Sequence, residues 1–120
     1  MRFEARDLKT YAEPVSASDL REETVYFFLN YIDDQLLIPE LTPVVFIGKN
    51  LHEGDSGTVY FQDAGSYRAG VRHSSSEARE NAVFHSGSEN QVNHVFEYEN
   101  ALNLLLLCSI RRQREGNTLP

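Results

Sequence analysis

Two segments in the first half of the chain are apolar on both alternating faces, which is typical of strands that are covered on both sides. The first spans residues 24–32 and the second spans residues 44–48. Pro39 and Pro43 precede the second segment, and because proline donates no hydrogen bond to a sheet, we expect regular pairing mainly within 44–48. A turn-rich stretch follows, so the sequence predicts an antiparallel hairpin over residues 44–62.

The segments around this hairpin have weaker patterns. Residues 8–15 read as a weak strand, and residues 63–70 as a short helical turn that Asp63 caps and Gly70 ends. Residues 71–81 are polar, and we expect a surface loop there.

A second hairpin is predicted in the last third of the chain. Residues 82–85 and 92–98 are strand-like, and a turn at Glu89–Asn90 would join them. This register places two pairs of residues opposite each other: Val83 with Phe96, and His85 with His94. Alternatively, residues 92–98 belong to the helix that follows.

A helix is predicted over residues 99–114. The four consecutive leucines Leu104–Leu107 sweep about 300° of its circumference, so the helix should be buried nearly all round. One helix cannot cover both faces of the strands, so the sheet must curve, form a partial barrel or meet a second copy of the chain. If no sheet covers them, Leu106, Leu107 and Ile110 form a predicted partner interface.

The fold class that we predict is α+β, with residues 1–120 forming a single domain. A curved, mostly antiparallel sheet of about five to seven strands packs on one C-terminal helix. Composition agrees with an ordinary folded domain, since the 120 residues are 41% hydrophobic and 24% charged. The single cysteine, Cys108, excludes an intrachain disulfide and reads as a small core residue.

The net charge of the chain indicates which classes of binding partner are favoured. The formal net charge is −7, from 11 basic and 18 acidic residues. A chain this acidic repels phosphate backbones, so nucleic-acid binding is disfavoured and a basic protein partner is favoured. The cluster of Arg111, Arg112 and Arg114 reads as the end of the helix, where cations complement the helix dipole. We find no secretory signal or membrane span and therefore expect a cytoplasmic protein.

Candidate chemistry is sparse. Of the histidines, only His85 and His94 converge in the predicted hairpin, where they would form a ligand-binding or pH-sensitive pair. No zinc motif, phosphate-binding loop or nucleophile motif is present, and we predict no metal and no cofactor. If the curved sheet has an aromatic mouth, its candidate walls are Tyr26, Tyr60, Phe84 and Tyr98.

These observations favour binding over catalysis. We expect a protein-interaction or regulatory module, for example of the immunity or inhibitor type, that binds a basic partner or a second copy of itself. The alternative is a small-ligand-binding domain, or an enzyme whose site is assembled in space near His85 and His94.

Overall fold

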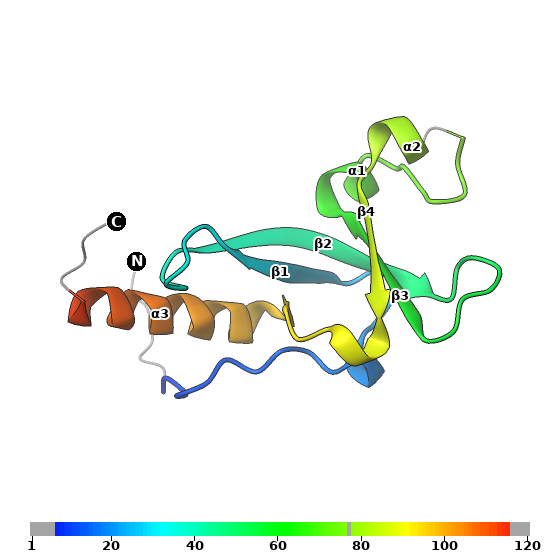
Figure 1. Cartoon of the computed structure of the whole chain (residues 1–120). Helices are drawn as coiled ribbons and strands as arrows, with labels where there is room; N and C mark the ends of the chain where they lie inside the picture. The colour runs from blue at the N-terminus through cyan, green and yellow to red at the C-terminus, as the bar shows by residue number, and fades with distance from the viewer. Residues whose placement is uncertain (1–6, 77, 116–120) are drawn as a thin grey trace.

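The computed structural model describes residues 7–76 and 78–115, which form a five-stranded antiparallel sheet packed with a C-terminal helix (Figure 1). The α+β class is therefore confirmed. The strands are β1 (Val25–Tyr31), β2 (Pro39–Lys49), β3 (Thr58–Asp63), β4 (Phe84–Ser88) and β5 (Val95–Phe96). The helices are η1 (Ala17–Asp19), α1 (Ala64–Arg68), α2 (Ala78–Asn81), η2 (Glu89–Gln91) and α3 (Tyr98–Arg114). The sheet order is β4-β3-β2-β1-β5, with β4 and β5 at its two open edges.

Strands β1, β2 and β3 form a meander that confirms both the first predicted strand and the predicted 44–62 hairpin. The expectation that prolines would restrict pairing was wrong, because Pro39 pairs with Tyr31 and Pro43 pairs with Phe27. Between residues 39 and 43, β2 has a neighbour only on the β1 side, since its pairing with β3 begins at Val44. Proline is tolerated on such an open edge, where a missing N–H breaks no second ladder.

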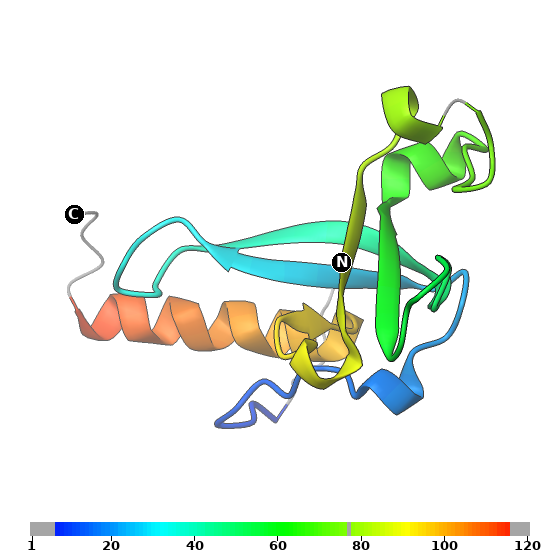
Figure 2. The same ribbon diagram turned by 45° about the vertical axis from the view of Figure 1, so that its right-hand side comes forward.

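A bulge in β2 helps the sheet to bend. The register with β3 shifts between Phe46 and Gly48, and Gly48 has a φ of +140°. A bulge of this kind increases the local twist of the strand. Figures 1 and 2 show the result, because β4 stands steeply across the direction of β1 and β2.

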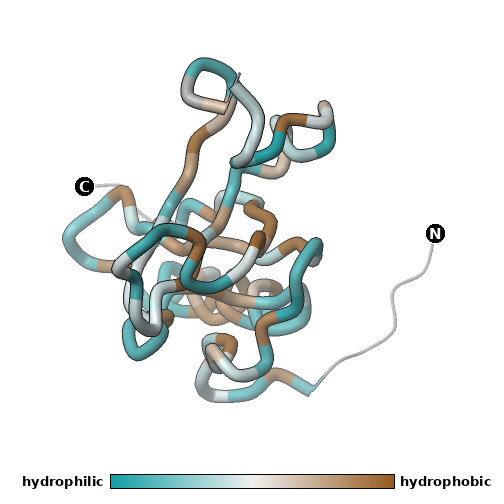
Figure 3. The backbone as a smooth tube through the Cα atoms, turned by 90° about the vertical axis from the view of Figure 1, so that its right-hand side faces the viewer, coloured by the Kyte–Doolittle hydropathy of each residue, from teal (hydrophilic) through white to brown (hydrophobic). Residues whose placement is uncertain are grey.

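Both faces of β1 are covered, as its pattern predicts. On one face, Tyr26 and Phe28 join a core with side chains from β2, β3 and β5, including Val44, Phe46, Phe61 and Val95. On the other face, Phe27, Leu29 and Tyr31 pack towards α3 around Phe96, Leu104 and Cys108. The curved sheet therefore covers one face of β1 and the helix covers the other. In Figure 3, hydrophobic positions recur through the middle of the molecule, and hydrophilic positions are frequent on the outer loops.

The predicted bounds of the C-terminal helix are confirmed to within one residue, and its three arginines occupy the last turn. Its predicted burial was wrong. Leu104 and Cys108 are buried, whereas Leu102, Leu105 and Leu106 are 39–43% exposed. The sheet covers one side of α3 and the N-terminal segment a second side, so the remaining arc faces outward (Figure 1).

Residues 8–15 run along α3 with a bend at Thr10 and Tyr11, and they do not form the predicted weak strand. Side-chain amides of α3 hold the backbone of this segment at Lys9 and at Glu13. The Lys9 N–H donates to Asn103 Oδ1 at 3.0 Å, and Asn103 Nδ2 donates to the Lys9 carbonyl at 3.2 Å. At the end of the segment, the Val15 N–H donates to the Val95 carbonyl at 2.8 Å. The side chain of Asn103, which is 9% exposed, thus makes the two hydrogen bonds to Lys9 that a neighbouring strand would otherwise make.

The second predicted hairpin was wrong. β4 pairs with β3, and β5 pairs with β1 on the opposite edge of the sheet. Neither Val83 with Phe96 nor His85 with His94 is a strand pair. Asp63 explains the choice of partner, because its side chain accepts from the Val83 N–H at 2.8 Å and so sets the start of β4 beside the end of β3. The η2 turn then carries the chain from one edge of the sheet to the other.

Candidate functional site

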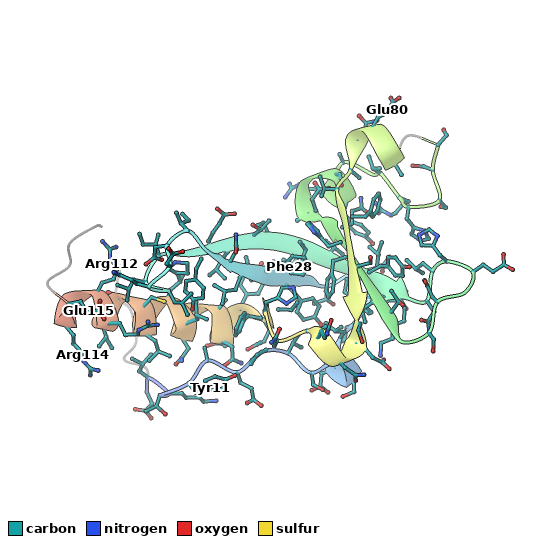
Figure 4. All side chains as sticks on the ribbon, viewed as in Figure 1. Tyr11, Phe28, Glu80, Arg112, Arg114 and Glu115 are labelled. Carbon is teal, nitrogen blue, oxygen red and sulfur yellow. The ribbon has the colours of Figure 1, made fainter. Side chains whose placement is uncertain are left out.

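A groove between α3 and the N-terminal segment combines apolar and cationic side chains. We call it the α3 groove. It has a volume of about 620 Å³ and is lined by Lys9, Arg111 and Arg114 together with Leu104, Leu107 and Ile110. Residues of β1 and the segment 8–14 complete its walls. In Figure 4, Arg114 and Tyr11, another lining residue, extend to the same side of α3, whereas Arg112 extends to the other side.

The α3 groove is locally positive in a chain of net charge −7. Among the described residues that line it, none is acidic. The Arg111 side chain is held in place, since Nη2 donates to the Gln35 carbonyl at 3.2 Å. Desolvation raises the pKa of Tyr31 and of Cys108, two further lining residues, so both are neutral at neutral pH. The groove can therefore attract an anionic group while holding an apolar group against its floor.

The structure separates the three residues of the predicted partner interface. Leu107 and Ile110 are half-buried and line the α3 groove. Leu106 lies outside it, on a row of exposed apolar side chains that we call the leucine stripe: Tyr98, Leu102, Leu105 and Leu106. Helix α3 thus offers two different surfaces in place of the single predicted one.

The two candidate histidines meet at one aromatic ring, although they are not strand partners. The centroid of the Phe28 ring lies 4.9 Å from that of His85 and 5.3 Å from that of His94. Both histidines line a groove of about 390 Å³, which we call the His85–His94 groove. Figure 4 places Phe28 where β4 crosses β1.

The curvature of the sheet brings these histidines together. His85 lies in β4 opposite Phe61, and His94 immediately precedes β5, where its carbonyl accepts from the Leu29 N–H at 2.8 Å. The two open edges of the sheet therefore approach each other over Phe28, with η2 passing between them. Ser86 and Gln91 add polar groups to the same groove.

The four aromatic residues proposed as ligand walls do not form one site but line two grooves in pairs. Tyr60 and Phe84 line a groove of about 380 Å³, and Tyr26 and Tyr98 line another of about 680 Å³. Phe84 lines the His85–His94 groove. The Tyr26 hydroxyl is buried and accepts from the Arg21 N–H, while the Tyr60 hydroxyl donates to Asp55. Tyr98 lies on α3, edge-on to Phe27 at 4.8 Å between centroids. The predicted aromatic mouth is therefore divided between separate grooves.

Lys9 and Tyr11 are among the lining residues of the α3 groove that sequence reasoning missed. They reach the groove because Asn103, 94 positions away, binds the Lys9 backbone. No local pattern signals a contact over that separation. Arg111 and Arg114 were predicted only to complement the dipole at the end of the helix. They do lie in its last turn, and they also line the α3 groove.

The described residues contain no group of three or more potential metal ligands and no helix that is long and apolar enough to cross a membrane. The chain matches no protein-family model, no curated protein sequence and no solved structure. Its class is consequently defined by the fold itself, an α+β structure with an open antiparallel sheet and a C-terminal helix.

Proposed function

We propose that this protein is a protein-interaction module whose α3 groove binds an extended partner segment carrying a large apolar side chain beside acidic residues. The observation that carries the proposal is the combination of an apolar floor with Lys9, Arg111 and Arg114 in an otherwise acidic chain. An apolar anchor in a groove supplies most of the binding free energy, and surrounding charges select the partner.

The walls of the α3 groove suit an extended peptide. One wall is the irregular segment 8–14, and the other is the C-terminal half of α3, so the groove between them is elongated. Leu107 and Ile110 offer an apolar contact, and the arginines can bind carboxylates in a bidentate manner. The basic partner that we predict from the net charge concerns other parts of the surface and stays a prediction, as does a regulatory or inhibitory role.

Selection from a random peptide library on the immobilised full chain tests this proposal. We expect the selected peptides to combine Asp or Glu with Leu or Phe, and to bind more weakly as salt rises. Arg114→Glu should weaken the selected peptides at least about tenfold, the size of effect expected for loss of a charged contact. Arg68→Glu is the matched control, because it makes the same charge change at an exposed residue of α1.

Two results would contradict the proposal. One is a set of selected peptides without acidic enrichment, and the other is equal loss of binding in the Arg114→Glu and Arg68→Glu variants. The second result would mean that overall charge, and not the α3 groove, determines binding.

A second candidate function is the binding of a small ligand in the His85–His94 groove. The specific observation in its favour is that two imidazoles flank one Phe28 ring in a groove with polar neighbours. Such a groove suits a small planar ligand that stacks and accepts hydrogen bonds. A fragment screen by NMR should then shift the imidazole C–H signals of both histidines together. Hits that leave both signals unchanged would remove this candidate.

A further inference from the structure

Two edge stretches of the sheet are protected against the addition of a further strand. Between residues 39 and 43, the open side of β2 carries Pro39 and Pro43, and a proline offers a neighbouring strand no N–H. β5 is only two residues long, and the Val15 N–H donates to its Val95 carbonyl at 2.8 Å. The edge at β4 differs from both, because its only neighbour in the sheet is β3 and no proline interrupts it.

Hydrogen bonds at the two ends of β4 determine which of its backbone groups face outward. The Asp63 N–H donates to the Val83 carbonyl at 3.0 Å, and the Glu89 N–H donates to the Gly57 carbonyl at 2.8 Å. In an antiparallel ladder, pairs that exchange hydrogen bonds alternate with pairs that do not. The residues of β4 whose N–H groups point away from β3 are therefore the even-numbered ones: Phe84, Ser86 and Ser88.

β4 also lacks the other features that protect edge strands. It contains no charged residue, and its register with β3 is regular, without a bulge. Space beside it is open, because a Cβ added to Gly87 would meet no heavy atom of the described residues within 4 Å. Such an edge is a template for one kind of ligand, since an extended backbone matches its alternating N–H and C=O groups.

We propose that β4 binds an uncharged extended segment of a partner protein, which adds to the open edge as a sixth strand. All five residues of β4 line the His85–His94 groove, and Gln91 and Val92 lie on its other side. A groove of about 390 Å³ holds a short single segment but not the edge of a second folded copy. Among the described residues that line it, none is Asp, Glu, Lys or Arg, which favours an uncharged segment.

The two faces of β4 determine which side chains the segment should carry. His85 and Gly87 share a face with Phe28 and Phe61, so side chains of the added strand on this face would enter the groove and contact aromatic rings. Side chains on the other face would lie beside Ser86. We therefore expect apolar residues to alternate with small polar ones. The segment would occupy the groove in place of the small ligand considered above, and its binding does not rest on the α3 groove.

A displayed library of seven-residue peptides tests the proposal. The library alternates Val, Ile, Leu or Phe with Ser, Thr or Asn, and peptides are selected on the immobilised full chain. Ser86→Pro should weaken the selected peptides at least about tenfold, because it removes the central outward N–H without removing a bond to β3. His73→Pro is the matched control. It places proline inside an exposed turn that the Ser75 N–H closes by donating to the Arg72 carbonyl, a position where proline is tolerated.

Amide hydrogen exchange of the wild-type chain, measured by NMR, tests the pairing without any substitution. In the free chain, the N–H groups of His85 and Gly87 should exchange more slowly than those of Phe84 and Ser86. Saturation with a selected peptide should slow exchange at Phe84 and Ser86 at least about tenfold, because these groups gain hydrogen bonds. Arg114→Glu should bind the peptides as the wild type does, which separates this result from the test of the α3 groove.

Four results would overturn the proposal. They are a library that yields no binding peptide, peptides that bind without slowing exchange at Phe84 and Ser86, equal affinity for Ser86→Pro and the wild type, and a free chain that forms a dimer which Ser86→Pro dissociates. The last result would mean that a second copy of the chain, and not a partner protein, pairs with β4.

Discussion

Two carboxylates, Asp55 in the β2–β3 loop and Asp63 at the end of β3, each bind several groups of the chain around them. Asp55 accepts from the His52 N–H at 3.0 Å and from the Tyr60 hydroxyl, which joins the β2–β3 loop to β3. Asp63 accepts from the Ser66 N–H at 2.9 Å and from the Val83 N–H, so it caps α1 and also positions β4. In each case a carboxylate accepts hydrogen bonds from donors that the surrounding turns leave unpaired.

The Tyr60–Asp55 contact should be visible in an alkaline titration. The hydrogen bond to Asp55 raises the pKa of Tyr60 to about 12, with burial and the negative charge adding to the shift. A raised pKa means that this contact stabilises the fold fully below about pH 10, the ordinary tyrosine pKa, and is lost between about pH 10 and 12. Asp55→Asn should move the Tyr60 transition towards pH 10.

Absorbance at 295 nm measures this transition, and subtraction of a Tyr60→Phe titration isolates it. Tyr11→Phe is the control at an exposed tyrosine. If the transition assigned to Tyr60 stays in place in Asp55→Asn, the carboxylate is not its cause.

Helix α3 has three surfaces with different surroundings. One side packs on β1 and Phe96, a second holds the N-terminal segment through Asn103, and the third carries the leucine stripe. Because the same helix forms a wall of the α3 groove, the segment that lies beside it shapes the groove as well. Asn103 is therefore a positioning residue for the proposed binding surface.

Replacement of Asn103 should loosen the N-terminal segment without unfolding the sheet. Asn103→Ala removes both hydrogen bonds to the Lys9 backbone, and we expect a loss of about 1–2 kcal/mol in the free energy of unfolding. Trypsin cleavage after Lys9 should become faster, since the backbone there is no longer held. Asn90→Ala, at an exposed asparagine in η2, is the control. Unchanged cleavage in Asn103→Ala would mean that other contacts hold the segment.

At the scale of the whole molecule, acidic residues bind backbone donors as well as giving the chain its charge of −7. Desolvation raises the pKa of Asp33 and of Asp63, but hydrogen bonds outweigh it and both pKa values lie below the ordinary range. For Asp33 the donors are the backbone N–H groups of Ile38 and Leu37. For Asp63 they are the Ser66 hydroxyl and the backbone N–H groups of Val83 and Ser66. For Asp55, the Tyr60 hydroxyl is the main cause of a lowered pKa.

The lowered pKa values of these three carboxylates predict that the free energy of unfolding falls in acid. Because their pKa values are lower in the folded chain, the unfolded chain binds protons first as pH falls. The stabilisation is complete above the ordinary Asp pKa of about 4 and is lost as pH falls through the lower folded values. Urea unfolding at pH 7, 5 and 3 should give a free energy that drops mainly below pH 4. Asp33→Asn should reduce that drop, whereas Asp34→Asn, at an exposed neighbour, should not.

Local patterns were sufficient wherever neighbours along the chain determine the structure. Three such features were predictable: the apolar strand β1, the Asp63 cap and the bounds of α3. Each depends on residues that lie close together along the chain. The need for curvature was also predictable, since one helix cannot cover both faces of a doubly apolar strand.

Contacts between distant segments were decided only by the tertiary structure. The 82–98 region has a plausible hairpin pattern, yet Asp63 binds Val83 and draws β4 to β3, while β5 joins β1. The histidine pair then forms over Phe28 by the approach of two sheet edges, and the α3 groove forms because Asn103 binds Lys9. By itself, the sequence determined the elements, the doubly covered strand and the acidic charge. The pairing of the strands and the surfaces left exposed depend on contacts between side chains many residues apart. A local hydrophobic pattern does not predict such contacts.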